Sequence, residues 1–136
     1  MAHLADLSEP ALALVVDRFY ARVRRDPEIG PVFETAVADW PEHLEKLTAF
    51  WSSVMLTSGR YKGSPMAAHM RLPLTPAMFE RWLALWTETT AEVFAPEIAA
   101  VLQAKAQRIA QSLQLALFFR PGAAPGAPPA RIPAQV

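Results

Sequence analysis

The sequence contains no cysteine, which excludes disulfides, zinc fingers, iron–sulfur clusters and thiol catalysis. It also lacks an excess charge of either sign, since 13 Lys and Arg side chains balance 13 Asp and Glu, so we expect neither nucleic acid nor an anionic membrane as a partner. No apolar run reaches the length of about 18 residues that a membrane-spanning helix needs. The first residues show no features of a signal peptide, and we therefore expect a cytoplasmic protein.

Alternation of apolar and polar residues with period two is missing over any useful length, which argues against a β-sheet. We find no glycine-rich phosphate loop, no serine–histidine–acid arrangement and no internal repeat. What is present is a chain of 136 residues, 52% of them hydrophobic, enough for one core or an apolar cofactor pocket. We predict one folded domain over residues 1–120 and a disordered tail over 121–136, because that tail is too rich in proline, glycine and alanine to pack.

Four stretches carry apolar residues at three- and four-residue spacing, which predicts four long helices and an all-α fold. Ser8, Asp39 and Thr75 precede three of them as candidate N-caps, each followed within two residues by a proline. Asp26-Pro27 ends the first helix, and Ala95-Pro96 separates the third from the fourth. The stretch between the first two helices reads as a corner with at most one short helical piece.

A histidine lies in a short segment bounded by Pro65 and Pro73, among methionines and alanines and two residues before an arginine. Proline prevents a long regular helix from passing through either end of this segment. An imidazole among apolar side chains, with a cation nearby, is what a proximal haem ligand requires. A lone histidine on an apolar face is more often an ordinary core residue, so the segment alone leaves both interpretations open.

A second histidine heads the apolar stripe of the second long helix. His43 lies four residues before Leu47 and seven before Phe50, so the three side chains point in roughly the same direction. This helix leads into a polar, basic loop with two glycines, which contains Tyr61 and Lys62. The loop precedes the proline-bounded histidine directly.

Six strings in this order resemble the third group of truncated haemoglobins in bacteria. They are Phe19-Tyr20, 26–33 (DPEIGPVF), 39–44 (DWPEHL), 50–53 (FWSS), 59–63 (GRYKG) and 69–73 (HMRLP). Each string alone is weak, but six in family order are specific, and the likeness runs from about residue 8 to 119. It makes residues 1–120 a globin domain and implies a two-over-two arrangement of helices around haem b.

The resemblance also implies roles for individual residues around the haem. His69 would bind the iron through one ring nitrogen while the other donates to a backbone carbonyl. Arg71, with Tyr61 and Lys62 from the basic loop, would hold the propionates, although the loop residues also read as an ordinary solvated loop. The apolar contacts to the haem would come from Phe33, Leu47, Phe50, Met66, Met70 and Trp82.

On the opposite face of the haem the family places Tyr20, His43 and Trp82. A phenol, an imidazole and an indole N–H are donors that stabilise negative charge developing on a bound diatomic ligand. From spacing alone, packing is the favoured interpretation of Tyr20 and Trp82, and the resemblance reverses that preference. His43, at the start of its helix, could point into the pocket or swing out as a gate.

Three functions stay open at this point. The first is a haem protein that reversibly binds dioxygen or nitric oxide at a five-coordinate iron with a polar distal pocket. The second is a haem enzyme for nitric oxide dioxygenation or peroxide reduction with an external reductase. The third is a haem-free helical interaction module that kept the fold. We favour the first.

Overall fold

The computed structural model of the chain describes residues 3–64 and 72–118. Within them the chain forms α1 (Glu9–Arg25), α2 (Gly30–Ala36), α3 (Trp40–Leu56), α5 (Pro76–Val93) and α6 (Pro96–Phe118). These residues form no β-strand, and a single isolated bridge pairs Leu4 with Phe94. The all-α prediction is therefore confirmed. The predicted tail, 121–136, lies outside the described residues and stays a prediction.

The predicted N-caps set the starts of three helices. The side-chain oxygens of Ser8, Asp39 and Thr75 each accept a hydrogen bond from the backbone N–H three residues later, at 3.2, 3.1 and 3.3 Å. A proline stands in the first turn of each of these helices, where its missing N–H costs nothing. The corner between α1 and α3 contains one short helix, α2, which has no side-chain cap.

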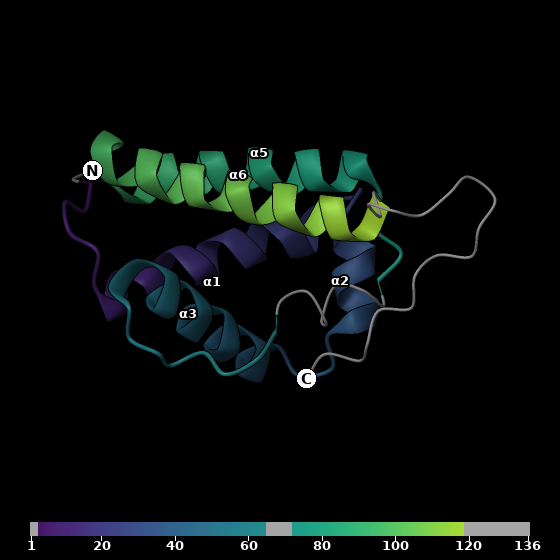
Figure 1. The fold of residues 1–136 in the computed structure, drawn as a ribbon, viewed down its shortest axis with the longest axis horizontal. Coiled ribbons are helices and arrows are strands. Elements are labelled where there is room, and N and C mark those ends of the chain that lie inside the picture. Colours follow the sequence, from purple (N-terminus) through teal and green to yellow (C-terminus); the bar gives the residue numbers. More distant parts are fainter. Residues whose placement is uncertain (1–2, 65–71, 119–136) are drawn as a thin grey trace.

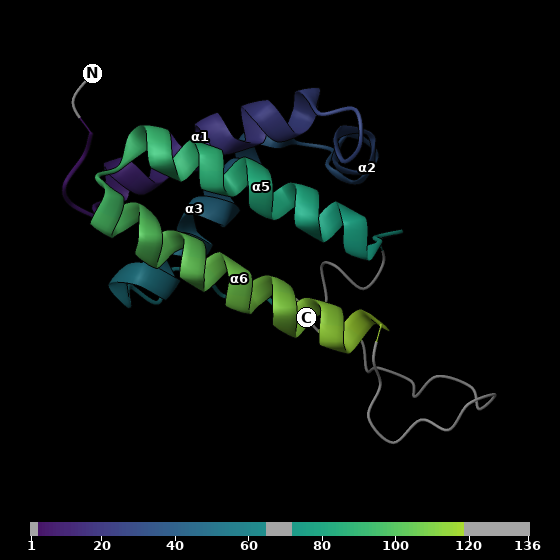
Figure 2. The ribbon, with the colours of Figure 1, turned by 90° about the horizontal axis from the view of Figure 1, so that it is seen from above.

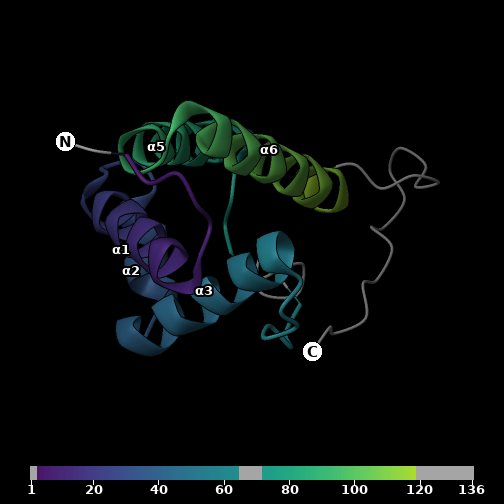
Figure 3. The same ribbon diagram turned by 90° about the vertical axis from the view of Figure 1, so that its left-hand side faces the viewer.

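The helices are arranged in two layers, which Figures 1 and 3 show from two sides. α5 and α6 form an antiparallel hairpin in one layer, and Figure 2 shows them side by side from above. α1 and α3 form the other layer, with α2 at one end of the molecule. This is the two-over-two arrangement that the resemblance implied. In the described residues, no helix is both long enough and apolar enough to span a membrane.

The core is centred on α1, which contacts α2, α3 and α5. Its inward face, Leu12, Val15, Val16, Phe19 and Val23, is completely buried. The indole of Trp86 is stacked on that of Trp51 at 4.6 Å, which joins the two layers. Trp86 Nε1 donates to the carbonyl of Leu102 at 3.1 Å and so ties α5 to α6.

Asp26 fixes the corner where α1 ends, α2 begins and α5 passes. Its carboxylate accepts hydrogen bonds from the backbone N–H groups of Glu28 and Ile29, both at 3.0 Å, and from Arg81 Nε on α5 at 2.7 Å. Burial alone would raise the pKa of Asp26, but these three donors outweigh it and hold the pKa below its ordinary value. Gly30 lies so close to α1 that a Cβ there would be 2.8 Å from the Arg24 carbonyl oxygen, so the corner requires glycine.

Candidate ligand-binding cavity

A cavity of about 1030 Å³ lies between the two layers and is lined mainly by apolar and aromatic side chains. α3 contributes one wall through Leu47 and Phe50, and α2 closes one end with Phe33. The opposite wall comes from α5 and α6 through Met78, Phe79, Trp82, Ile109 and Leu113. The cavity therefore presents dry surfaces on opposing sides, as expected for a site that holds a large flat group.

The structure brings eight of the predicted site residues to this one cavity. They are Tyr20, Phe33, His43, Leu47, Phe50, Tyr61, Lys62 and Trp82. The other four, Met66, His69, Met70 and Arg71, lie outside the described residues, and their roles stay predictions. Within the described part of the chain, no cluster of three or more His, Asp or Glu side chains is suited to holding a metal ion.

Tyr20 lines the cavity wall and is deeply buried, with 4% of its surface exposed. The indole N–H of Trp82, its only polar group, donates a hydrogen bond to the Tyr20 hydroxyl. Burial raises the pKa of Tyr20 to about 12, against the opposing effect of this bond. The phenol is thus neutral, accepts from Trp82, and keeps its own proton to donate elsewhere.

This hydrogen bond links the two predicted donors to each other. From the sequence, Tyr20 and Trp82 were both expected to donate to a bound diatomic ligand. The hydrogen bond from the Trp82 indole to the Tyr20 hydroxyl couples the two residues, and their roles toward a ligand stay predictions.

His43, in the first turn of α3, lies on the cavity side of its helix. Its ring meets the ring of Tyr20 edge to face with centroids 6.0 Å apart, and the ring of Trp40 at 5.5 Å. Tyr20 and Trp40 are themselves 6.1 Å apart. The imidazole is therefore turned inward and packed between two aromatic side chains.

The segment 57–64 forms the rim of the cavity. The Tyr61 N–H donates to Ser53 Oγ at 2.9 Å, and its ring meets that of Phe50 edge to face at 5.3 Å. Burial raises the pKa of Tyr61, while the positive charge of Lys46 opposes that rise. With Lys62, which also lines the cavity, Lys46 places positive charge at this rim.

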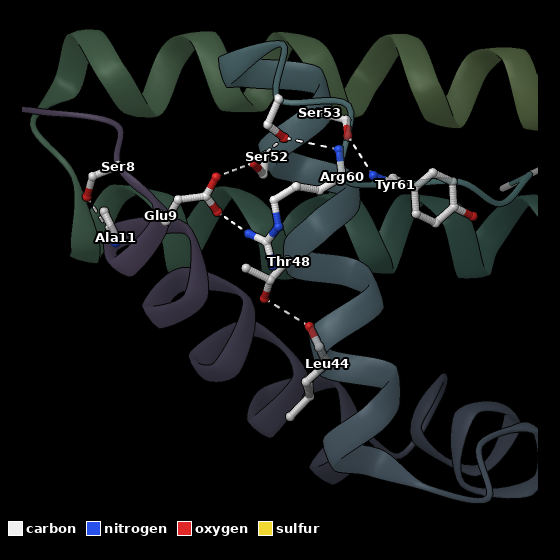
Figure 4. A network of polar contacts seen from close by, with 10 residues as sticks. Ser8, Glu9, Ala11, Leu44, Thr48, Ser52, Ser53, Arg60 and Tyr61 are labelled. Atoms are coloured by element: carbon white, nitrogen blue, oxygen red, sulfur yellow. Dashed lines mark hydrogen bonds and ion pairs between the residues drawn. The ribbon is translucent and has the colours of Figure 1, made fainter.

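A polar network holds this rim in place, as Figure 4 shows. Arg60 forms an ion pair with Glu9 at the start of α1, and the same carboxylate accepts a hydrogen bond from the Ser52 hydroxyl. Ser52 is completely buried and lies 2.6 Å from Ser58 Oγ. Arg60 therefore anchors the rim to α1 through Glu9.

Sequence reasoning missed part of the cavity wall. Met78 and Phe79 lie one turn before Trp82 on the same helix, so helical spacing was a usable signal for them. Ile109 and Leu113 also share one helix face, but nothing in the sequence shows that this face crosses the cavity. Nothing in the sequence indicated that Lys46 lines the cavity, because its spacing from Glu42 is that of an ordinary exposed ion pair on one helix.

Two layers of helices around an apolar cavity, with a buried tyrosine and a histidine on one wall, define a globin. The chain matches the model of the bacterial-like globin family over residues 8–117, and it belongs to that family.

Two comparisons refine this assignment. The chain is 34% identical over 101 residues to the group 3 truncated hemoglobin ctb of Campylobacter jejuni, which covers 71% of this chain and 80% of that protein. It also matches the crystal structure of the group III truncated hemoglobin from Campylobacter jejuni with a TM-score of 0.82 and 33% identity, over 86% of this chain and 96% of that one. The resemblance to the third group of truncated haemoglobins is confirmed.

Proposed function

We propose that the cavity holds haem b, with His69 as the iron ligand, and that the protein reversibly binds a diatomic molecule such as dioxygen or nitric oxide. The observation that carries this proposal is the pairing of an apolar cavity with one buried, neutral phenol, Tyr20, whose hydroxyl is hydrogen-bonded to Trp82. Membership of a globin family supports the same conclusion.

The described residues fit haem in size and in chemistry. A volume of about 1030 Å³ is at the upper end of the range, roughly 300–1,000 Å³, that cofactor and ligand pockets occupy. Phe33 on α2 and Leu47 and Phe50 on α3 supply apolar surface on one side of the cavity. Met78 on α5 and the α6 residues supply it on the opposite side. Lys46 and Lys62 at the rim suit the two carboxylates of haem b.

When bound, haem supplies an open iron position for a diatomic ligand. The chain's own residues then decide how firmly such a ligand is held. Tyr20 would donate a hydrogen bond to such a ligand and so stabilise negative charge on it. Trp82 keeps the Tyr20 hydroxyl pointed in the right direction, and His43 stands beside it on the same side of the cavity.

Redox turnover on the same cofactor is the second candidate. The polar group formed by Tyr20, Trp82 and His43 favours it, because such groups also assist O–O bond cleavage. Nitric oxide dioxygenation or peroxide reduction would need electrons from an external reductase. Ligand binding needs no second protein, and we favour it for that reason.

Haem titration followed by rapid mixing tests the proposal. Added haem should give a saturable, intense absorption band near the violet edge of the visible spectrum, with one haem per chain. The reduced protein should then bind dioxygen and release it unchanged when dioxygen is removed. Absence of the band would exclude haem binding, whereas multiple turnovers of nitric oxide or peroxide would favour the enzyme.

A further inference from the structure

The end of α1 and the start of α3 meet in a compact four-residue cluster. Tyr20 and Arg24 lie one turn apart on α1, and Trp40 and His43 lie one turn apart on α3. Such spacings place each pair on one face of its helix. Trp40 touches the other three: its ring is 6.1 Å from that of Tyr20, 5.5 Å from that of His43, and 4.5 Å from the guanidinium carbon of Arg24.

Arg24 covers the ring of Trp40 and is itself held from α2. Its Nε donates to Glu34 Oε1 at 2.7 Å, so α2 contributes to the position of the guanidinium. Both charged side chains are nearly half exposed, which limits the strength of each contact. A cation over an indole at such a site shifts a two-state equilibrium by roughly two- to fivefold.

The ring of Trp40 is not fixed by a directional bond. Its Nε1 is buried and has no hydrogen-bond partner among the described residues. A buried donor without a partner disfavours the conformation that contains it. Packing and the Arg24 cation therefore hold the Trp40 ring in place against this cost. The observed position of the Trp40 ring is for that reason only modestly preferred.

We propose that Arg24 and Trp40 form a clamp that keeps His43 turned toward Tyr20 and closes the α1–α3 side of the cavity. Trp40 blocks the space through which the His43 ring would have to move outward. Arg24 acts through Trp40 and is a positioning residue, about one helical turn removed from the cavity wall. This inference rests on the proposed function, because it assigns the clamp control over how fast a diatomic ligand reaches the cavity.

The test compares three variants of the full chain, loaded with haem and reduced. Arg24→Gln removes the cation, and Trp40→Ala removes the ring. Arg25→Gln is the matched control, since it makes the same charge change on the next residue, whose Nε contacts only its own helix at the Ala21 carbonyl among the contacts described. Carbon monoxide is released by a laser flash, and its bimolecular rebinding rate and its C–O stretching bands are recorded.

We expect Arg24→Gln to speed carbon monoxide rebinding two- to fivefold and Trp40→Ala to speed it tenfold or more, with Arg25→Gln unchanged. The C–O band of the His43-inward form should lose intensity to a second band in the same order, an effect that a merely structural role would not produce. If Trp40→Ala does not fold, the surface variant Arg24→Gln decides alone.

Three results would overturn the clamp, and they are distinguishable. Wild-type rebinding and band ratios in both Arg24→Gln and Trp40→Ala, with a normal haem spectrum, would remove the clamp but leave haem binding intact. An equal acceleration in Arg25→Gln would show a general charge effect. A wild-type protein that takes up no haem would remove the proposed function itself.

Discussion

Replacing Tyr20 by Phe takes one hydroxyl from the cavity wall and keeps the ring that packs on Phe19 and Phe33. The hydroxyl already accepts from Trp82, so its proton is available to a ligand. A hydrogen bond to a partly charged acceptor contributes about 1.5–3 kcal/mol. Dioxygen dissociation should therefore be roughly ten- to a hundredfold faster in Tyr20→Phe.

The same argument gives a smaller effect for Trp82→Phe. That change removes only the neutral hydrogen bond that orients Tyr20, worth about 0.5–1.5 kcal/mol, so dissociation should be roughly two- to tenfold faster. Because Trp82 acts through Tyr20, the double variant should release dioxygen as fast as Tyr20→Phe alone. The pKa of about 12 keeps the Tyr20 proton in place, so the wild-type rate should not change with pH up to about pH 10 through this group.

Stopped-flow displacement of bound dioxygen by carbon monoxide measures these rates directly. Carbon monoxide dissociation is the internal control and should change little, because that ligand carries less negative charge when bound. Unchanged dioxygen dissociation in Tyr20→Phe would refute the hydrogen-bonding role. A double variant whose effect equals the product of the two single effects would show instead that Trp82 donates to the ligand independently.

Three further predictions concern other parts of the chain. His69→Ala should bind haem weakly or with altered coordination, whereas the control His3→Ala, at an exposed position, should bind haem like the wild type. An unchanged iron–histidine stretching band in His69→Ala would contradict the assignment. A chain ending at Arg120 should take up haem like the full chain, because 121–136 has too little apolar surface to pack; a large loss of haem affinity would show otherwise. Asp26→Asn should lower the free energy of unfolding at neutral pH by about 1.5–3 kcal/mol, since Arg81 and two backbone donors lose a charged acceptor. Because the folded-state pKa of Asp26 is lowered, that stabilisation is present above the ordinary carboxyl pKa and lost as pH falls through the folded value, so urea unfolding curves of the two proteins should converge in acid; a constant difference at every pH would be inconsistent with this origin.

Local chemistry made the helix boundaries predictable. An N-cap depends on one side chain and the N–H three residues on, so Ser8, Asp39 and Thr75 could be read directly from the sequence. The shared direction of His43, Leu47 and Phe50 follows from helical periodicity in the same way, and all three line the cavity.

Contacts between distant segments could not be predicted from the sequence. The bond from Trp82 to Tyr20 depends on how α5 crosses α1, and the ion pair of Arg60 joins it to a residue 51 positions away. Spacing also favoured Trp82 as part of the buried stripe of its helix, yet it is only half-buried because it faces the cavity. Thr89 and Thr90 are buried instead, their hydroxyls bonded to the carbonyls one turn earlier.

The uneven burial of the helices bears on how the cavity opens. α3 contributes two buried residues over its 17, whereas α1, of the same length, contributes seven. Segments with few buried apolar contacts open locally at a lower free energy than the rest of a domain. α3 should therefore exchange its amide hydrogens before α1, α5 and α6 do, and a large flat cofactor would be able to enter or leave by local unfolding of this one wall while the remaining helices stay folded.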